Sequence, residues 1–239
     1  METRVTEIWV YLSQTPLLWL TMTLLVYQGA YWLYQRANMI PIFNPVLLAV
    51  VALVGILMLT DTSYATYFEG AQFVHFLLGP ATVALAVPLY LNVRKLREMA
   101  WAIGVGLLVG SVVAIVSAVW IGQALGVSDV ILLSLAPKSV TTPIAMGISE
   151  KIGGLPSLTA VLVIMTGILG AMMGRGFLQW IGVTDRSVLG FAMGLASHGI
   201  GTARAFQVDD EAGAFSGLAM GLNAVVTALL VPLIIGWLI

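Results

Sequence analysis

The sequence has very few charged residues. Only 9% of its 239 residues are Asp, Glu, Lys or Arg, whereas 60% are hydrophobic. Soluble domains carry roughly 25% charged residues, and a soluble fold with so few would expose larger apolar patches than soluble monomers tolerate. The composition therefore excludes a water-soluble globule and predicts an integral membrane protein.

Cysteine is absent, which excludes disulfides, thiolate metal sites and thiol nucleophiles. The two histidines, His75 and His198, are too few and too far apart in sequence to predict a metal site. Lys and Arg are scattered and the net charge is -1, so no basic stripe could follow a nucleic-acid backbone. The chain also lacks a nucleophile elbow and a phosphate loop. We therefore expect neither an enzyme nor a cofactor, metal or nucleic-acid partner.

Apolar stretches fill most of the chain. The eight stretches are Leu17 to Leu33, Ile42 to Leu59, Phe73 to Leu91, Met99 to Ile121, Val130 to Ile148, Leu158 to Met173, Val188 to Phe206 and Ala212 to Ile239. A bilayer crossing needs about 20 apolar residues, so no room is left for a soluble domain. We expect one all-α polytopic membrane domain over residues 1–239, with six to eight transmembrane segments.

Three of these stretches are interrupted. The third contains Gly79-Pro80, the fifth contains Pro137-Lys138, and the seventh contains the polar run from Ser197 to Gly201. Proline removes a backbone donor and glycine weakens a helix, so we expect non-helical backbone at membrane depth. In transporters, discontinuous helices of this kind build the substrate site.

The fifth and seventh stretches belong to an internal repeat. The run that begins at Ala136 aligns without gaps with the run that begins at Ala196, an offset of 60 residues. Each copy, approximately 128–180 and 187–239, has an interrupted polar segment, an acidic connection and then an uninterrupted apolar helix. We interpret the two copies as an inverted repeat with discontinuous, re-entrant helices.

The basic residues predict the orientation. If the fifth and seventh stretches are re-entrant hairpins and the N-terminus lies outside, six basic residues face the cytoplasm and two face out. The six are Arg36, Arg94, Lys95, Arg97, Arg175 and Arg186, and the two are Arg4 and Lys151. If every stretch crosses the membrane, the ratio falls to five against three, so the count favours re-entrant hairpins over eight full crossings.

In the first copy, Lys138 lies in an apolar run, where a cation costs about 2.5 to 3.5 kcal/mol. The hydroxyls of Ser139, Thr141 and Thr142 lie in the same segment. An ammonium group together with hydroxyls suits a small carboxylate. The alternative is a lysine at a loop end that extends to the membrane interface.

The second copy places His198 at the position of Lys138. Its candidate substrate-binding residues are Ser197, His198, Gly199, Gly201, Thr202 and Arg204. A guanidinium can bind a carboxylate through two parallel hydrogen bonds, although Arg204 could instead pair with the acids that follow it. His198 could be a hydrogen-bonded core residue or a proton relay.

Four further residues are candidates for a gate or for ion coupling. They are Glu150, Asp210, Glu211 and Asn223. The acids could equally be solvated loop residues that cap a helix, and a single buried amide often cross-links helices. Gly-x-x-x-Gly pairs, among them Gly106/Gly110, Gly170/Gly174 and Gly190/Gly194, predict close helix packing and no chemistry.

Three motifs resemble the LrgB/CidB family of bacterial membrane proteins. They are Leu135 to Met146 (LAPKSVTTPIAM), Ala196-Ser197-His198 with Gly201 to Arg204, and Glu211 to Ser216 (EAGAFS). The likeness runs from about Pro41 to the end of the chain. It implies a multi-pass protein of the bacterial cytoplasmic (inner) membrane that acts with an LrgA/CidA-like subunit.

The resemblance implies two functions. Members of the family are described as holin- or antiholin-like modulators of murein hydrolase export and autolysis, and as carriers of small carboxylates such as pyruvate. Plastid relatives move glycolate and glycerate. Because cations and hydroxyls recur in the interrupted segments, we expect a secondary transporter of pyruvate, lactate, glycolate or glycerate that works by alternating access. The sequence leaves open proton coupling and homo-oligomer formation.

Overall fold

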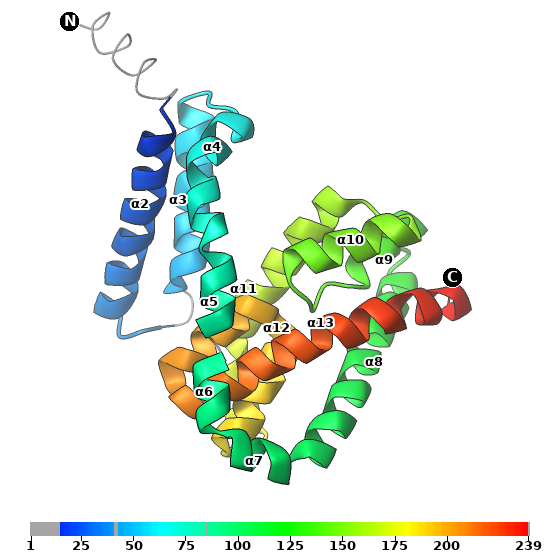
Figure 1. The fold of residues 1–239 in the computed structure, drawn as a ribbon. Helices are drawn as coiled ribbons and strands as arrows, with labels where there is room; N and C mark the ends of the chain where they lie inside the picture. Colours follow the sequence, from blue (N-terminus) through cyan, green and yellow to red (C-terminus); the bar gives the residue numbers. More distant parts are fainter. Residues whose placement is uncertain (1–14, 41–42, 85, 239) are drawn as a thin grey trace, which may run out of the picture. The chain divides into compact units, whose positions relative to one another are not determined.

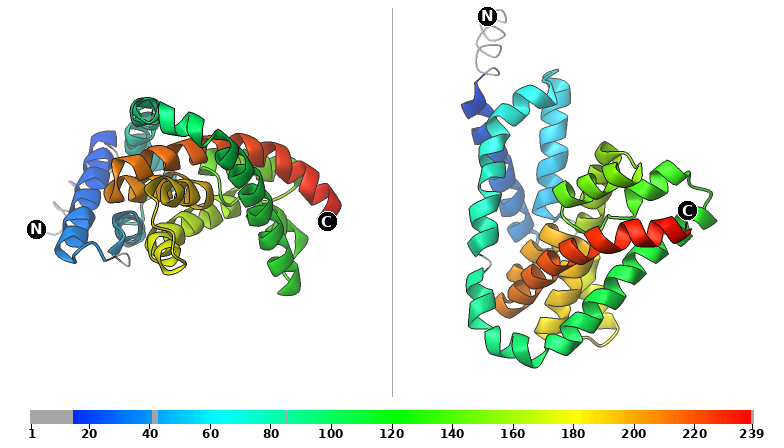
Figure 2. Two further views of the ribbon diagram at one scale, coloured as in Figure 1. Left: turned by 90° about the horizontal axis from the view of Figure 1, so that it is seen from below. Right: turned by 45° about the vertical axis from the view of Figure 1, so that its right-hand side comes forward.

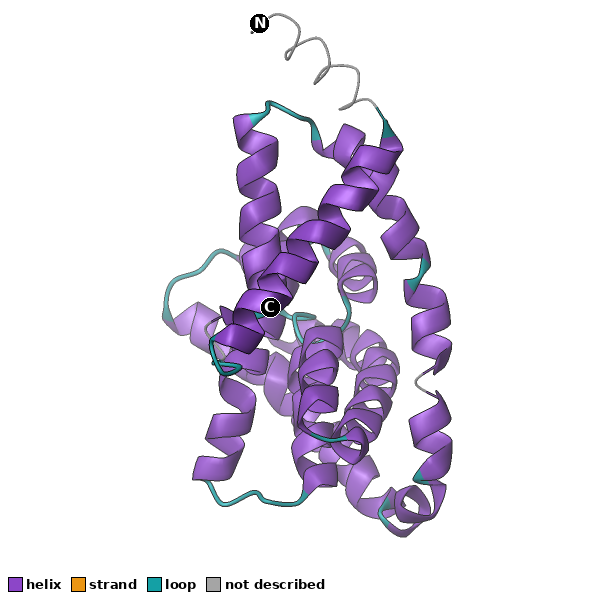
Figure 3. Ribbon diagram, turned by 90° about the vertical axis from the view of Figure 1, so that its left-hand side faces the viewer, coloured by secondary structure: helices purple, strands orange, loops and turns teal. Residues whose placement is uncertain are grey.

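The structure, a computed structural model, describes residues 15–40, 43–84 and 86–238. These residues form helices joined by loops, and none of them lies in a strand (Figure 3). The all-α class is therefore confirmed for this part of the chain. Arg4, Ile42 and Ile239, which entered the orientation count or bounded predicted stretches, lie outside the described residues.

The chain divides into two compact units, Met1–Ala84 and Leu85–Ile239. The described helices of the first unit are α2 (Pro16–Arg36), α3 (Pro45–Leu59), α4 (Tyr64–Phe76) and α5 (Leu78–Ala84). Trp19 of α2 is buried and packs edge-on against Tyr67 of α4, with 5.9 Å between the ring centroids. Gly70 lets the two helices approach closely, because a Cβ there would lie 2.8 Å from the Leu20 nitrogen.

The second unit carries both copies of the repeat. Its helices are α6 (Ala86–Leu91), α7 (Val93–Glu98), α8 (Ala100–Ala124), α9 (Asp129–Leu135), α10 (Thr142–Ile152), α11 (Pro156–Trp180), α12 (Arg186–Val208) and α13 (Asp210–Leu238), labelled in Figure 1. Their bounds follow the predicted stretches closely. Proline is found in the first turn of α10 and α11, where its missing N–H costs no helical hydrogen bond.

Within the described residues, four segments are long and apolar enough to cross a membrane. They are Tyr64–Leu91, Ala100–Ala124, Pro156–Trp180 and Asp210–Leu238. These segments agree with a membrane protein. The predicted number of crossings, the orientation and the single domain over residues 1–239 stay predictions.

Helix α12 folds back on itself. Ser197 (φ -132°, ψ 16°) and His198 (φ 42°, ψ -135°) leave helical geometry in its middle. The two ends then meet, since Arg186 forms an ion pair with Asp209, whereas a straight helix of 23 residues would separate them by about 35 Å. The halves of α12 therefore lie antiparallel, which is the geometry that a re-entrant segment requires.

The first copy is broken between α9 and α10. Six residues, 136–141, connect the end of α9 to the start of α10, and the two helices lie side by side (Figure 1). The end of α9 is held at the start of α11. There the Ser134 hydroxyl accepts a hydrogen bond from Leu155 N (2.8 Å), and the Thr159 hydroxyl donates to Ser134 O (2.9 Å).

Helices α8 and α13 run in the same direction. Lys95, just before α8, pairs with Glu211 in the first turn of α13. At the other end, Gln123 Nε2 donates to Leu238 O (3.2 Å). Figure 2 shows α13, coloured orange to red, against the second half of α12, coloured orange.

A cluster of charged residues occupies one end of the second unit. It comprises Lys95, Asp185, Arg186, Asp209 and Glu211, and we call it the charge cluster. The hydrogen bond to Glu211 raises the pKa of Lys95, and the hydrogen bond from the Ser187 hydroxyl lowers the pKa of Asp185. Both groups therefore stay charged at neutral pH. The cluster places both ends of α12 on one side of the unit.

We predict that single cysteines will report the side on which each connection lies. Because the natural chain has no cysteine, only the introduced thiol can react. Thr184→Cys, exposed between α11 and α12 near the charge cluster, should resist a membrane-impermeant maleimide in intact cells and react after permeabilisation. Glu150→Cys, exposed on α10, should react in intact cells. The reverse pattern would disprove the re-entrant hairpins and favour eight full crossings.

Candidate functional site

A cavity of about 550 Å³ lies between α8, the break before α10, α11 and the break in α12. Four of its lining residues have polar side chains: Lys138, Ser139, Thr166 and Ser197. The other side chains are apolar or absent, with Leu169, Met173 and Phe177 along α11. Both copies of the repeat thus contribute to one cavity.

Lys138 supplies the cation of this cavity. Its Nζ donates a hydrogen bond to Ala114 O of α8 (3.0 Å), and no acidic side chain in the described part of the chain pairs with it. An ammonium group has three N–H donors, so two remain for a ligand. The neighbouring Ser139 is buried and also lines the cavity.

Ser197 brings the second copy to the same cavity. It is buried at the break in α12 and lies against Gly170 of α11, where a Cβ would be 2.7 Å from the Ser197 Cβ. Glycine at this position therefore lets the tip of α12 reach the cavity between α8 and α11.

His198 is a buried, hydrogen-bonded residue next to the cavity. Its Nε2 lies 3.0 Å from Val163 O of α11, and Gly167 leaves room for the ring, since a Cβ there would lie 2.7 Å from Cε1. His198 is not among the lining residues. At the aligned positions of the repeat, Lys138 and His198 thus each bind a main-chain carbonyl of a neighbouring long helix, α8 or α11.

Asn223 joins the two helix breaks. Its Nδ2 donates to Leu195 O at the break in α12 (2.9 Å) and to Ser139 O at the break before α10 (3.5 Å). Its Oδ1 accepts hydrogen bonds from the hydroxyls of Ser111 (2.7 Å) and Thr227 (3.0 Å). Asn223 is only 1% exposed. These contacts are those of an amide that cross-links helices, and they lie at the two helix breaks.

The remaining candidates lie away from the cavity lining. Thr202 is buried and hydrogen-bonds the Ser216 hydroxyl of α13 (3.0 Å), Arg204 donates to Gln207 Oε1 (3.0 Å), and Thr141 and Thr142 are half-buried. Gly199 and Gly201 follow the break in α12. That these residues bind the same ligand as Lys138 stays a prediction.

The candidate gate acids are found in different surroundings. Glu211 belongs to the charge cluster and binds Lys95. Glu150 and Asp210 are exposed. A gate or coupling role for these acids therefore stays a prediction.

The glycine pairs have two roles, of which the sequence predicted one. Gly190 and Gly194 pack α12 against the backbone of α13, since a Cβ at either would lie within 2.7 Å of main-chain carbon, as predicted. Gly110 and Gly170 also pack closely, since a Cβ would lie 2.9 Å from Leu195 Cδ2 or 2.7 Å from Ser197 Cβ, and together with Gly174 they line the cavity. On α11 both glycines of the pair line the cavity, whereas on α8 only Gly110 does.

A sequence model of the LrgB-like family matches residues 23–237. The chain belongs to the LrgB-like family. Among its relatives, YwbG of Bacillus subtilis is 37% identical over 92% of this chain and 97% of its own. YxaC of the same species is 36% identical over 91% and 94%. The holin-like protein CidB of Staphylococcus epidermidis is 31% identical over 91% and 95%. No solved structure matches this LrgB-like chain.

We predict that Asn223→Leu destabilises this LrgB-like protein. Leucine is similar in size but leaves Leu195 O and Ser139 O without the amide donor, and each buried unsatisfied polar group costs about 1 to 3 kcal/mol. The free energy of unfolding, measured by denaturant titration in detergent, should fall by at least that amount. Val225→Ala, two residues along and exposed, is the control and should change it by about 0.5 kcal/mol or less. Equal stability of Asn223→Leu and the natural chain would remove Asn223 from this role.

Proposed function

We propose that this protein is a secondary transporter of small monocarboxylates, with Lys138 as the primary carboxylate-binding group. The observation that carries the proposal is a cation within a cavity bordered by two broken helices, without an acidic partner among the described residues. Lys138 is half-buried, and a charge held in an apolar segment is costly unless it is paired. A bound carboxylate supplies that pairing, and the hydroxyls of Ser139 and Ser197 can bind its remaining oxygen lone pairs.

The position of the cavity supports alternating access. Discontinuous helices from two inverted repeats form the substrate sites of many secondary transporters, and here both breaks border one cavity and share the Asn223 amide. Movement of one copy against the other would change the side from which Lys138 is reached. Substrates of the pyruvate, lactate, glycolate and glycerate class fit within the cavity volume.

The site is proposed to act in the bacterial inner membrane together with an LrgA/CidA-like subunit. Arg204 is proposed as a second carboxylate ligand, reached when the second half of α12 moves. Replacing Arg204 by Lys should then weaken binding, because a point charge loses the two-point geometry of the guanidinium.

We predict that Lys138→Ala abolishes carboxylate binding. Loss of one partner of a buried charge pair costs about 3 to 5 kcal/mol, so the half-saturating substrate concentration should rise more than a hundredfold. Uptake of labelled pyruvate and glycolate into proteoliposomes, with and without the LrgA-like subunit, measures this. Arg97→Met removes an exposed cation outside the cavity and should transport normally. Near-native affinity in folded, monodisperse Lys138→Ala would show that the proposed site is wrong.

Proton coupling is proposed to depend on His198. Glutamine at this position can still donate to Val163 O but cannot titrate, so His198→Gln should keep substrate exchange and lose acceleration by an imposed pH gradient. Uptake with and without the pH gradient, at equal substrate concentration, separates substrate exchange from proton coupling. Unchanged gradient dependence would leave His198 as a core hydrogen-bonding residue.

The alternative function is holin-like or antiholin-like modulation of murein hydrolase export and autolysis. It rests on the name of the CidB relatives. A lesion-forming protein should release an entrapped dye from proteoliposomes without substrate specificity, and Lys138→Ala should not affect release. A carrier should retain the dye and saturate with substrate, so the same vesicles decide between the two functions.

A further inference from the structure

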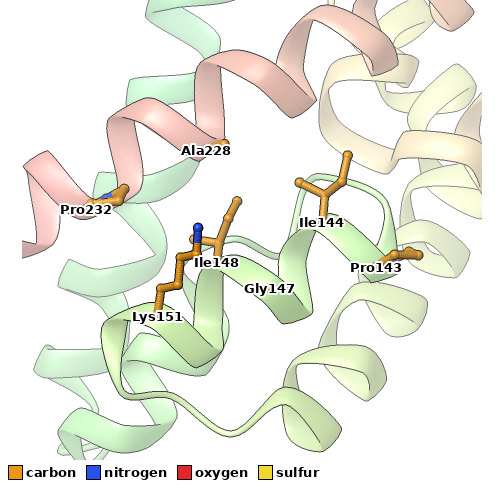
Figure 4. Close-up of a pocket in the computed structure, with 7 residues that line it drawn as sticks. All are labelled: Pro143, Ile144, Gly147, Ile148, Lys151, Ala228 and Pro232. Carbon is orange, nitrogen blue, oxygen red and sulfur yellow. The ribbon is translucent and has the colours of Figure 1, made fainter.

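A second, smaller hollow shares no lining residue with the cavity at Lys138. It is a groove of about 260 Å³ between one face of α10 and the C-terminal part of α13. Its residues, drawn in Figure 4, are Pro143, Ile144, Gly147, Ile148, Lys151, Ala228 and Pro232. Apart from Lys151, these side chains are apolar or absent. We call this hollow the α10–α13 groove.

The α10–α13 groove lies at the end of α13 opposite the charge cluster. Pro232 follows Asp210 by 22 residues along α13, which corresponds to about 33 Å of helix. The hydrocarbon core of a bilayer is about 30 Å thick. If α13 crosses the bilayer from the charge cluster, the groove comes level with the opposite interface, where lipid headgroups meet acyl chains.

Pro232 leaves an acceptor in this groove. It lies inside α13 and has no N–H, so the carbonyl of Ala228, four residues earlier, lacks the helical donor it would otherwise have. Beside lipid, such a carbonyl needs a donor from elsewhere. Both residues line the groove and are exposed.

Lys151 supplies a cation to the same groove. Its side chain extends from α10 toward α13, on the side of Ala228 and Pro232 (Figure 4), and it is paired with no acidic side chain in the described part of the chain. The groove thus presents one cation and one free carbonyl beside an apolar wall of Ile144 and Ile148. Its ligand must carry an anionic acceptor, an N–H donor and an apolar chain.

We propose that the α10–α13 groove is a binding site for phosphatidylethanolamine. Lys151 binds the phosphate, the ethanolamine ammonium donates to Ala228 O, and an acyl chain lies along Ile144 and Ile148. Phosphatidylglycerol offers the phosphate and hydroxyl donors but no ammonium group, and phosphatidylcholine offers a quaternary nitrogen without N–H. The site should therefore distinguish these lipids by their donors.

A thermal-stability titration of the full chain in detergent tests the proposal. Phosphatidylethanolamine at about a hundred times its Kd should raise Tm by roughly 5 to 10 °C for a chain of this size. The monomethyl lipid, which keeps N–H donors, should retain most of the shift, and phosphatidylcholine should lose most of it. Soluble phosphoethanolamine should give no shift. Equal shifts with phosphatidylcholine and phosphatidylethanolamine, or a shift with the soluble headgroup, would overturn the proposal.

Two variants separate the two contacts. Lys151→Met should remove the shift for every phospholipid, and Arg97→Met, an exposed cation elsewhere, should keep it. Pro232→Ala restores the backbone N–H to α13 and so supplies Ala228 O with a helical donor. This variant should fold at least as well as the natural chain and should no longer distinguish phosphatidylethanolamine from phosphatidylcholine. A preference that survives Pro232→Ala would overturn the role of the carbonyl.

Discussion

The second unit depends on hydrogen-bond donors for the main-chain carbonyls at its two helix breaks. A broken helix in a membrane exposes polar main-chain groups that lipid cannot solvate. The Asn223 amide donates to one such carbonyl in each copy, Leu195 O and Ser139 O, and its oxygen accepts hydroxyls from α8 and α13. One side chain therefore hydrogen-bonds a main-chain carbonyl at each of the two breaks.

The close packing around these breaks depends on glycines, which have no side chain to keep the helices apart. Gly190 and Gly194 bring α12 into contact with the backbone of α13, and Gly170 admits Ser197 of the α12 tip. Gly110 of α8 and Gly174 of α11 border the cavity that Lys138 lines, and a Cβ at Gly110 would also lie 2.9 Å from the Leu195 side chain. The same residue type thus permits close contact and borders the cavity.

Charged side chains have different partners at the end of the second unit and in its interior. The charge cluster joins Lys95, Arg186 and their acidic partners at one end of the unit, where water can solvate them. Inside, the basic residues at the aligned repeat positions, Lys138 and His198, bind main-chain carbonyls. A carbonyl satisfies one donor of an ammonium group without neutralising it, which leaves Lys138 suited to an anionic ligand.

The sequence by itself determined the helices, the breaks in the fifth and seventh stretches and the family, because apolar length and Pro or Gly interruptions act locally along the chain; Gly79-Pro80, also predicted as a break, lies within α5. It also singled out Lys138, Ser139 and Ser197, which line the cavity. Only the tertiary structure decided that Asn223 joins both breaks, that Gly110 and Gly174 border the cavity, and that Arg204 binds Gln207 away from its lining. These outcomes depend on which helix faces meet when α12 folds back, and that choice is made by contacts between residues far apart in the sequence.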